Sequence, residues 1–165
     1  MARLHACLAA GLHVQYEGGL RVPQIIRWKG RIGAGSSDVP VTSIDLFPTI
    51  AEAARVSLPE SLEIDGTSLM PLLEDRPSEL ARQSIYWHYP HYWQEETPYS
   101  VIRKGSLKLI RRYEGSHYEL YDLDRDLSER RNLAKQMPDQ VRVLDAELGT
   151  WLDETGAILP VLRAQ

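Results

Sequence analysis

Two histidines separated by two residues, His88 and His91, are the side chains of this sequence best suited to chemistry. They lie in the segment 87–92, which reads WHYPHY. A His-x-x-His pair can chelate a metal ion, but Pro90 breaks the helical geometry that usually aligns such a pair. Two other roles stay open: an imidazole that donates a hydrogen bond to a bound ligand, and a structural His-Tyr cluster at the end of a strand.

A second group of candidate side chains is basic. These residues could attract an anionic ligand. They fall mostly on predicted turns and strand faces, where charge is commonly solvated or protects a sheet edge, and we expect that role more often than ligand binding. The group comprises Arg103, Lys104, Lys108, Arg111 and Arg112.

The elements that position these residues follow from hydrophobic periodicity. An alternation of period two, interrupted by Gly-bearing turns at 104–106 and 114–116, predicts an antiparallel meander. Its strands should cover residues 84–89, 99–104, 107–113 and 118–123. A helix beginning at Pro138 and ending near Gly156 should then pack on this sheet. Its apolar stripe is Val141, Leu144, Leu148, Trp151 and Leu152.

The first half of the chain predicts two further elements. The apolar run Ile25 to Trp28, bounded by Gly30, favours a buried strand of a parallel sheet. A helix over residues 45–56 should begin at Asp45 as its N-cap. Four of its residues should face the core: Phe47, Ile50, Ala51 and Ala54.

Size and charge limit the class of protein. A chain of 165 residues can bury one real core. The net charge of -4 gives no general attraction to nucleic acid or to a membrane surface, so we expect neither as a partner. Residues 1–14 are moderately apolar, but they lack a convincing signal-peptide pattern, and no stretch is long enough to span a bilayer. The localisation is therefore left unknown.

Four sequence strings, in order, resemble those of one enzyme family. Residues 16–23 read YEGGLRVP, residues 43–50 read SIDLFPTI, residues 65–73 read DGTSLMPLL, and residues 121–133 run from YDL to Asn132-Leu133. They resemble motifs of the type I (arylsulfatase-like) sulfatases of the alkaline-phosphatase-like superfamily. The resemblance covers residues from about 15 to about 154 and leaves residues 1–14 unmatched.

The resemblance implies hydrolysis of a sulfate ester, plausibly on a carbohydrate, with formylglycine and calcium as cofactors of the intact enzyme. This chain has no Cys/Ser-x-Pro-x-Arg motif and no Asp-Asp pair, and Cys7 is followed by Leu-Ala-Ala. The family's active-site lysine would fall on Leu12. We therefore expect no catalytic residue, metal ligand or cofactor in the chain itself, and an incomplete enzyme if it stands alone.

The resemblance also assigns the remaining site residues. It makes His88 and His91 groups that contact the substrate. Glu17, Gly18, Gly19 and Arg21 belong to a structural loop, in which Glu17 and Arg21 could pair.

The expected fold class is α/β, an α+β fragment. It would comprise the end of an alkaline-phosphatase-like core sheet and a C-terminal four-stranded antiparallel sheet packed by a helix. The expected organisation is an unmatched segment 1–14, a remnant of the catalytic core at 15–76, and a C-terminal subdomain at 77–165. Unpartnered edges and apolar faces would favour a homo-oligomer. The alternatives are a non-catalytic binding or assembly module, or a fragment of a related phosphodiesterase or phosphonate hydrolase.

Overall fold

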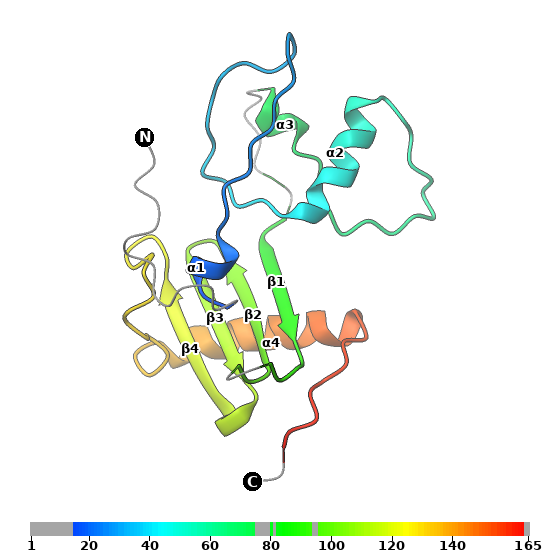
Figure 1. Cartoon of the computed structure of the whole chain (residues 1–165). Helices are drawn as coiled ribbons and strands as arrows, with labels where there is room; N and C mark the ends of the chain where they lie inside the picture. The colour runs from blue at the N-terminus through cyan, green and yellow to red at the C-terminus, as the bar shows by residue number, and fades with distance from the viewer. Residues whose placement is uncertain (1–14, 75–79, 81, 94–95, 164–165) are drawn as a thin grey trace. The chain divides into compact units, whose positions relative to one another are not determined.

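The computed structural model describes residues 15–74, 80, 82–93 and 96–163. The predicted segment 1–14, with Cys7 and Leu12, lies outside the described residues, as does the predicted boundary at 76–77. The chain forms two compact units (Figure 1). Unit 1 combines Met1–Pro23 with Ser84–Gln165, and unit 2 is Gln24–Gln83. The predicted three-part division stays a prediction.

Unit 1 is built on a four-stranded antiparallel sheet in the order β1-β2-β3-β4. The strands are β1 (Ser84–Tyr89), β2 (Tyr99–Lys104), β3 (Leu107–Arg112) and β4 (His117–Asp122). Gly105 takes φ +58° in the turn between β2 and β3, a conformation that glycine adopts without steric cost. The 3-10 turn η2 (Glu114–Ser116) connects β3 to β4. The four predicted strands are confirmed, each to within one residue.

One face of the sheet packs against helix α4 (Pro138–Glu154). Ile102, Leu109 and Leu120 stand opposite one another on three strands and are fully buried there. Four leucine and valine residues of α4 cover them, and Trp151 stacks on Tyr86 with ring centroids 4.7 Å apart. This packing confirms the predicted amphipathic stripe.

Helix α4 ends as its sequence predicts. Gly156 takes φ +62°, its N–H donates to the carbonyl of Asp153, and the N–H of Ala157 donates to the carbonyl of Leu152. These two bonds form the Schellman motif that commonly ends helices at glycine.

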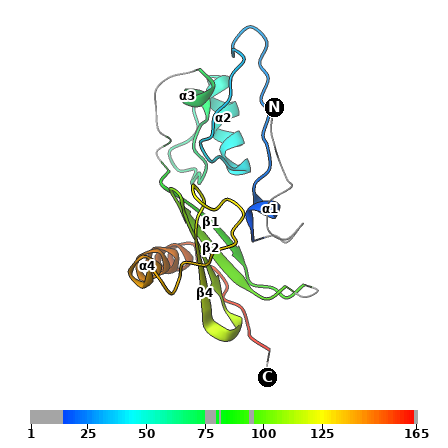
Figure 2. The same ribbon diagram turned by 90° about the vertical axis from the view of Figure 1, so that its left-hand side faces the viewer.

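The opposite face of the sheet is covered in part by the N-terminal segment of unit 1. The short helix α1 (Glu17–Leu20) lies on this side, and α4 lies on the other (Figure 2). The buried residues of this face are Tyr99, Val101, Ile110, Tyr121 and Leu123, against which Tyr16 packs. Because side chains alternate along each strand, both faces of the sheet can be buried by different parts of the chain.

Unit 2 contains the 3-10 turn η1 (Ser43–Asp45) and the helices α2 (Leu46–Ala53) and α3 (Met70–Leu73). The side chain of Thr49 on α2 joins two of the sequence strings. Its hydroxyl donates to the carbonyl of Asp45 at 2.5 Å and accepts the N–H of Leu69 at 2.8 Å. Gly66 lies so close to the turn that an added Cβ would stand 2.1 Å from the carbonyl oxygen of Ile44.

Asp45 is the polar centre of unit 2. Its buried carboxylate accepts the N–H of Thr42 at 2.7 Å and the N–H of Thr67 at 2.9 Å, and it receives Arg82 through both oxygens at 2.6 and 2.9 Å. Asp45 precedes the first residue of α2, as predicted, but its side chain does not cap that helix. It instead closes a capping box on Thr42 at the start of η1.

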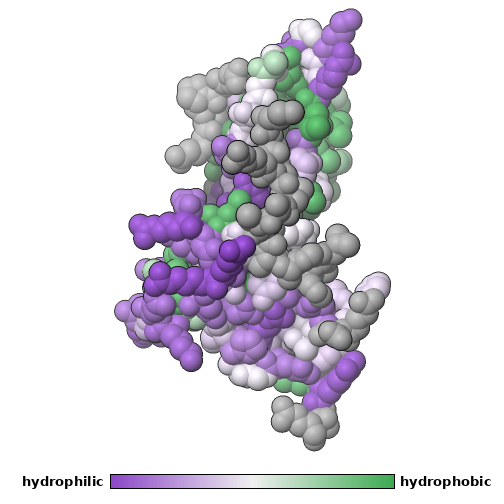
Figure 3. Space-filling model, turned by 60° about the vertical axis from the view of Figure 1, so that its left-hand side comes forward, coloured by the Kyte–Doolittle hydropathy of each residue, from purple (hydrophilic) through white to green (hydrophobic). Residues whose placement is uncertain are grey.

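Two predictions for unit 2 are wrong. Residues 25–28 form no strand, and Ile25 is 92% exposed, because no other strand in the described part of unit 2 supplies hydrogen-bond partners. On α2 the apolar residues Phe47 and Ile50 are exposed, whereas Thr49 and Ala51 are buried. The helix thus turns its larger apolar side chains to the surface. Hydrophobic residues are also exposed on the face of the molecule that Figure 3 shows. Ala54 is also exposed.

Candidate functional site

The Glu-Gly-Gly segment docks on the sheet through a buried ion pair. Glu17 is buried, and its Oε1 accepts a hydrogen bond from Lys108 Nζ at 3.0 Å. Lys108 is itself fully buried and lies 2.8 Å from Glu129 Oε1. The second oxygen of Glu129 accepts the main-chain N–H of Glu17 at 2.6 Å. We call Glu17, Lys108 and Glu129 the buried charge cluster; it ties together three segments far apart in sequence.

The charges of this cluster are balanced by arginines at its margin. Arg103 lies 3.8 Å from Glu17 Oε2, and Arg21 lies 4.0 Å from the same oxygen. The Glu17–Arg21 pair expected from the sequence is therefore present, but the buried Lys108 is the closer partner. Burial raises the pKa of Glu129, against the opposing charge of Lys108. A charge buried in this cluster is tolerated because it is paired and hydrogen-bonded.

A second polar cluster holds the neighbouring Tyr16. Its hydroxyl donates to Glu119 at 2.9 Å, and Tyr121 donates to the same oxygen at 2.6 Å. Arg112 donates to the other oxygen at 2.9 Å. Burial would raise the pKa of Glu119, but the hydrogen bonds from Tyr121, Arg112 and Tyr16 outweigh it and hold that pKa below its ordinary value.

The periodicity of β3 explains why both clusters form on one face. Lys108, Ile110 and Arg112 occupy every second position of β3, so all three project to the same side of the sheet. Tyr16 and Glu17 contact the sheet on this side, and these contacts fix both residues on the strands. Gly18 and Gly19 lie within α1, directly after the docked glutamate.

His88 ends a chain of hydrogen bonds within unit 1. Its Nδ1 lies 2.7 Å from Ser100 Oγ, which lies 2.8 Å from the hydroxyl of Tyr113. Its Nε2 lies 2.9 Å from the carbonyl oxygen of Ile158. Since a carbonyl can only accept, Nε2 carries the proton in the neutral ring, and Nδ1 accepts from Ser100. Both ring nitrogens thus have partners within the chain.

His91 lies apart from this chain of hydrogen bonds. It is exposed, and its ring meets that of Tyr89 edge to face, with centroids 5.6 Å apart. Among the residues that the structure describes, no group of three or more His, Cys, Asp or Glu side chains could hold a metal ion. The substrate-contacting roles of His88 and His91 stay predictions.

The basic side chains considered from the sequence form ion pairs inside unit 1. Lys104 pairs with Glu147 at 2.7 Å, and Arg111 donates to Asp145, in addition to the pairs of Arg103, Lys108 and Arg112 given above. Sequence reasoning missed these pairs because the acidic partners come from α1, β4, α4 and the loop before α4. The inward-facing position of Lys108 in the alternation of β3 was the one available signal.

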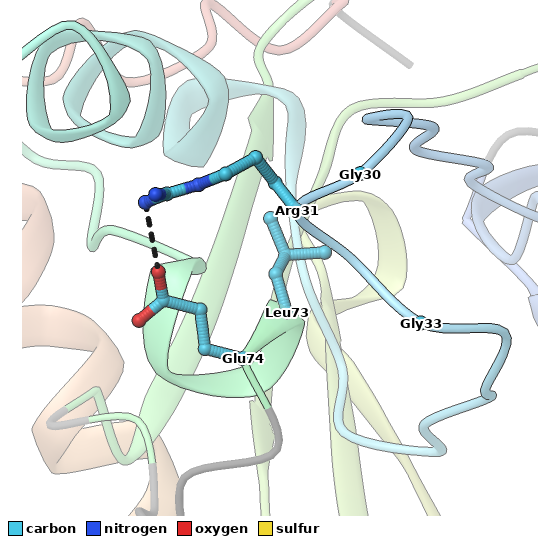
Figure 4. Close-up of a pocket in the computed structure, with 5 residues that line it drawn as sticks. All are labelled: Gly30, Arg31, Gly33, Leu73 and Glu74. Carbon is cyan, nitrogen blue, oxygen red and sulfur yellow. Dashed lines mark ion pairs between the residues drawn. The ribbon is translucent and has the colours of Figure 1, made fainter.

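Unit 2 has a polar pocket of about 450 Å³ (Figure 4). Gly30, Gly33 and Leu73 line it, together with Arg31 and Glu74, whose charged groups lie 3.8 Å apart. The guanidinium of Arg31 also lies over the ring of Trp28 at 5.3 Å. The cationic group at this pocket is therefore already paired within the unit.

The meander with its covering helix forms the α/β fold on which the Glu-Gly-Gly segment docks. Residues 12–155 match the model of the family described as N-sulphoglucosamine sulphohydrolase, C-terminal. The chain belongs to this family, which confirms the resemblance found in the sequence.

Individual relatives agree with this assignment. A sulfatase of Formosa agariphila is 35% identical over an alignment of 158 positions, and the match covers 86% of this chain and 29% of that protein. A solved structure from work on the metabolism of multiple glycosaminoglycans by Bacteroides thetaiotaomicron is 27% identical, with a TM-score of 0.68, and the match covers 87% of this chain and 32% of that one. A structure with its substrate D-glucosamine-2-N,6-O-disulfate is 32% identical, with a TM-score of 0.50, over 67% of this chain and 23% of that one.

The chain spans about 29% of the length of the Formosa agariphila sulfatase. The expected fold class is confirmed by these structures, including the four-stranded sheet with its helix. No helix in the described ranges is long and apolar enough to cross a membrane.

Proposed function

We propose that this chain serves as the C-terminal domain of a sulfuric ester hydrolase that acts on a sulfated carbohydrate. Its membership of the N-sulphoglucosamine sulphohydrolase C-terminal family is the observation that carries the proposal. A solved relative with D-glucosamine-2-N,6-O-disulfate as its substrate supports a sulfated sugar as the ligand class. The nucleophile and the calcium ligands that the resemblance implies would come from sequence beyond these 165 residues, because the motifs that provide them are absent here.

Within this proposal the domain has two tasks. The buried charge cluster positions the Glu-Gly-Gly segment, which in the resembling family follows the active-site lysine. His88 supplies a hydrogen bond to an oxygen of the substrate through Nε2, whose proton is fixed by the Ser100 and Tyr113 hydrogen bonds. An oriented donor of this kind stabilises negative charge on a sulfate group without moving in the reaction.

A chimera tests the proposal. This chain replaces the matched part of the Formosa agariphila sulfatase, which is 29% of that protein, and sulfate release is measured from an aryl sulfate and from sulfated disaccharides. We expect sulfate release above that of the host enzyme lacking the segment. A folded chimera that releases no sulfate but cleaves a phosphonate monoester would favour the alternative hydrolase class.

A non-catalytic assembly module remains the second candidate, since several apolar side chains of unit 2 are exposed, with Ile25 at 92% and Ile50 at 65%. A folded chimera that cleaves neither ester would favour this candidate.

A further inference from the structure

The segment that follows α4 in unit 1 contacts His88 at Nε2, the ring nitrogen on the side away from Ser100. Residues 157–163 leave the helix after the Schellman motif and run beside the end of β1 (Figure 1). The carbonyl oxygen of Ile158 accepts from His88 Nε2 at 2.9 Å. We call residues 157–163 the strap.

A second anchor fixes the other end of the strap. The main-chain N–H of Arg163 donates to the hydroxyl of Tyr92 at 3.1 Å, and its guanidinium lies 4.0 Å from the centroid of the Tyr92 ring. Tyr92 follows β1 by three residues and lies four residues after His88 in the chain. Both anchors of the strap therefore lie around the same end of β1.

Between these anchors the strap is weakly packed. The side chains of Ile158 and Val161 are 82% and 90% exposed, and Leu159 and Leu162 are also exposed. The strap thus buries little apolar surface, and little apolar stabilisation would be lost if it moved away. Its attachment depends on a few hydrogen bonds at the surface, each of which contributes only about 1 kcal/mol net.

The groups behind His88 are, in contrast, firmly held. Ser100 is fully buried and stands directly opposite His88 in the β1–β2 register. The hydroxyls of Ser100 and Tyr113 lie on the Nδ1 side of the His88 ring. Nε2 is therefore the donor that points away from these hydrogen bonds. The preorganised N–H donor at His88 Nε2 is therefore bonded to a neutral carbonyl of the weakly packed strap. An anionic sulfate oxygen would be the stronger acceptor, because hydrogen bonds to charged groups are shorter and stronger.

We propose that the strap covers a sulfate-binding donor at His88 and must leave before a sulfated sugar binds there. This inference rests on the proposed function and adds the regulation of the same site: the Ile158 carbonyl occupies the place of a ligand oxygen. The apparent association constant for the ligand is then the intrinsic constant multiplied by the fraction of molecules in which the strap is open.

Binding of D-glucosamine-2-N,6-O-disulfate to the chain itself tests the proposal, by isothermal titration calorimetry, which gives an affinity for every variant. Shortening the chain after Ala157 removes both anchored ends of the strap, Ile158 and Arg163, but keeps the Schellman bond that Ala157 makes to α4. We expect the shortened chain to bind about three- to tenfold more tightly than the full chain, as loss of one or two competing hydrogen bonds implies. His88→Ala should abolish this gain, whereas His117→Ala, in an exposed histidine of β4, should preserve it.

Tyr92→Phe offers a second variant if the shortened chain does not fold. It removes the acceptor of the Arg163 N–H and keeps the aromatic ring, so it should strengthen binding by about twofold. Equal affinity of the full and loosened chains would overturn the proposal, as would a gain that survives in His88→Ala. The chimera tests the sulfatase assignment by whether sulfate is released at all, whereas the strap is tested by the difference in affinity between the full and loosened chains, so the two failures can be distinguished.

Discussion

Lys108 Nζ lies 3.0 Å from Glu17 Oε1, although 91 residues separate the two in sequence. The lysine is completely buried on β3, and the glutamate opens the Glu-Gly-Gly segment. This pair, with Glu129, is the physical connection between a sequence motif of the sulfatase family and the sheet of its C-terminal domain. Its strength determines how firmly the motif is held.

Lys108→Met should reduce the free energy of unfolding by about 3–5 kcal/mol, because it leaves two buried carboxylates without their cation. Urea unfolding followed by tryptophan fluorescence measures the loss. Lys104→Met is the matched control: its pair with Glu147 is partly exposed to solvent, so its loss should cost clearly less than the loss of the buried pair. Equal losses in the two variants would contradict the importance of the buried charge cluster.

Thr49→Val should destabilise unit 2 by about 1–3 kcal/mol, since the substitution nearly keeps the shape but leaves the buried N–H of Leu69 without its acceptor. Thr49→Ser keeps the hydroxyl and should cost clearly less. Thermal unfolding of the three proteins gives the comparison. A serine variant as unstable as the valine variant would show that the hydroxyl bond is unimportant.

Gly66→Ala should disrupt the contact between η1 and the 65–69 segment. The added Cβ would stand 2.1 Å from the carbonyl oxygen of Ile44, so the backbone itself must shift, with an expected cost of more than about 2 kcal/mol. Gly35→Ala meets nothing within 4 Å and serves as the control. If both variants unfold at the temperature of the parent chain, the close approach at Gly66 does not exist in solution.

Acid should unfold the chain through its buried carboxylates. Burial would raise the pKa of Asp45, but the hydrogen bonds from Arg82, Thr67 and Thr42 lower it below its ordinary value, and the pKa of Glu119 is also lowered. A lowered folded pKa gives stability that is complete above the ordinary carboxyl pKa, about 4, and is lost as the pH falls through the folded value. Glu129 contributes to the pH dependence of stability with the opposite sign. Its pKa is raised in the folded protein, so its ionisation lowers the stability as the pH rises.

Urea midpoints between pH 7 and pH 3 measure this dependence. The midpoint should fall steeply below about pH 4. Asp45→Asn should lower stability at pH 7 and show a shallower fall on acidification, because one of the titrating groups is gone. A midpoint that does not change between pH 7 and pH 3 would contradict the paired state of these carboxylates.

The homo-oligomer expected from exposed edges stays a prediction that light scattering can test. Phe47 and Ile50 are 54% and 65% exposed on α2. If they join copies of the chain, Phe47→Ser together with Ile50→Ser should shift the mass towards the monomer. A parent chain that is already monomeric at high concentration would refute the expectation.

Local patterns predicted the sheet and α4 well because each of these elements has its apolar partner within the same unit. The alternation of β2 and β3 and the stripe from Val141 to Leu152 match surfaces that this chain provides. The run Ile25 to Trp28 carries an equally apolar pattern, yet the described residues provide no strand beside it, so periodicity alone predicted a strand that does not form.

The candidate site was predicted only in part. The motif identified Glu17, and the aromatic segment identified His88, but neither revealed its partner. Lys108 and Ser100 reach these residues through strand pairing, and Ile158 reaches His88 through the course of the chain after α4. Such partners depend on tertiary contacts, which no local spacing in the sequence encodes.

Hydrogen exchange at the main-chain amide of Glu17 tests the central claim most directly, that the Glu-Gly-Gly segment is held on the sheet by buried charges. This amide donates to Glu129 at 2.6 Å and lies in a short helix that could not persist unaided. Protection comparable to that of the β3 amides, lost in Lys108→Met while β3 stays protected, is the predicted result. Exchange at the rate of an unfolded peptide in the parent chain would contradict the account.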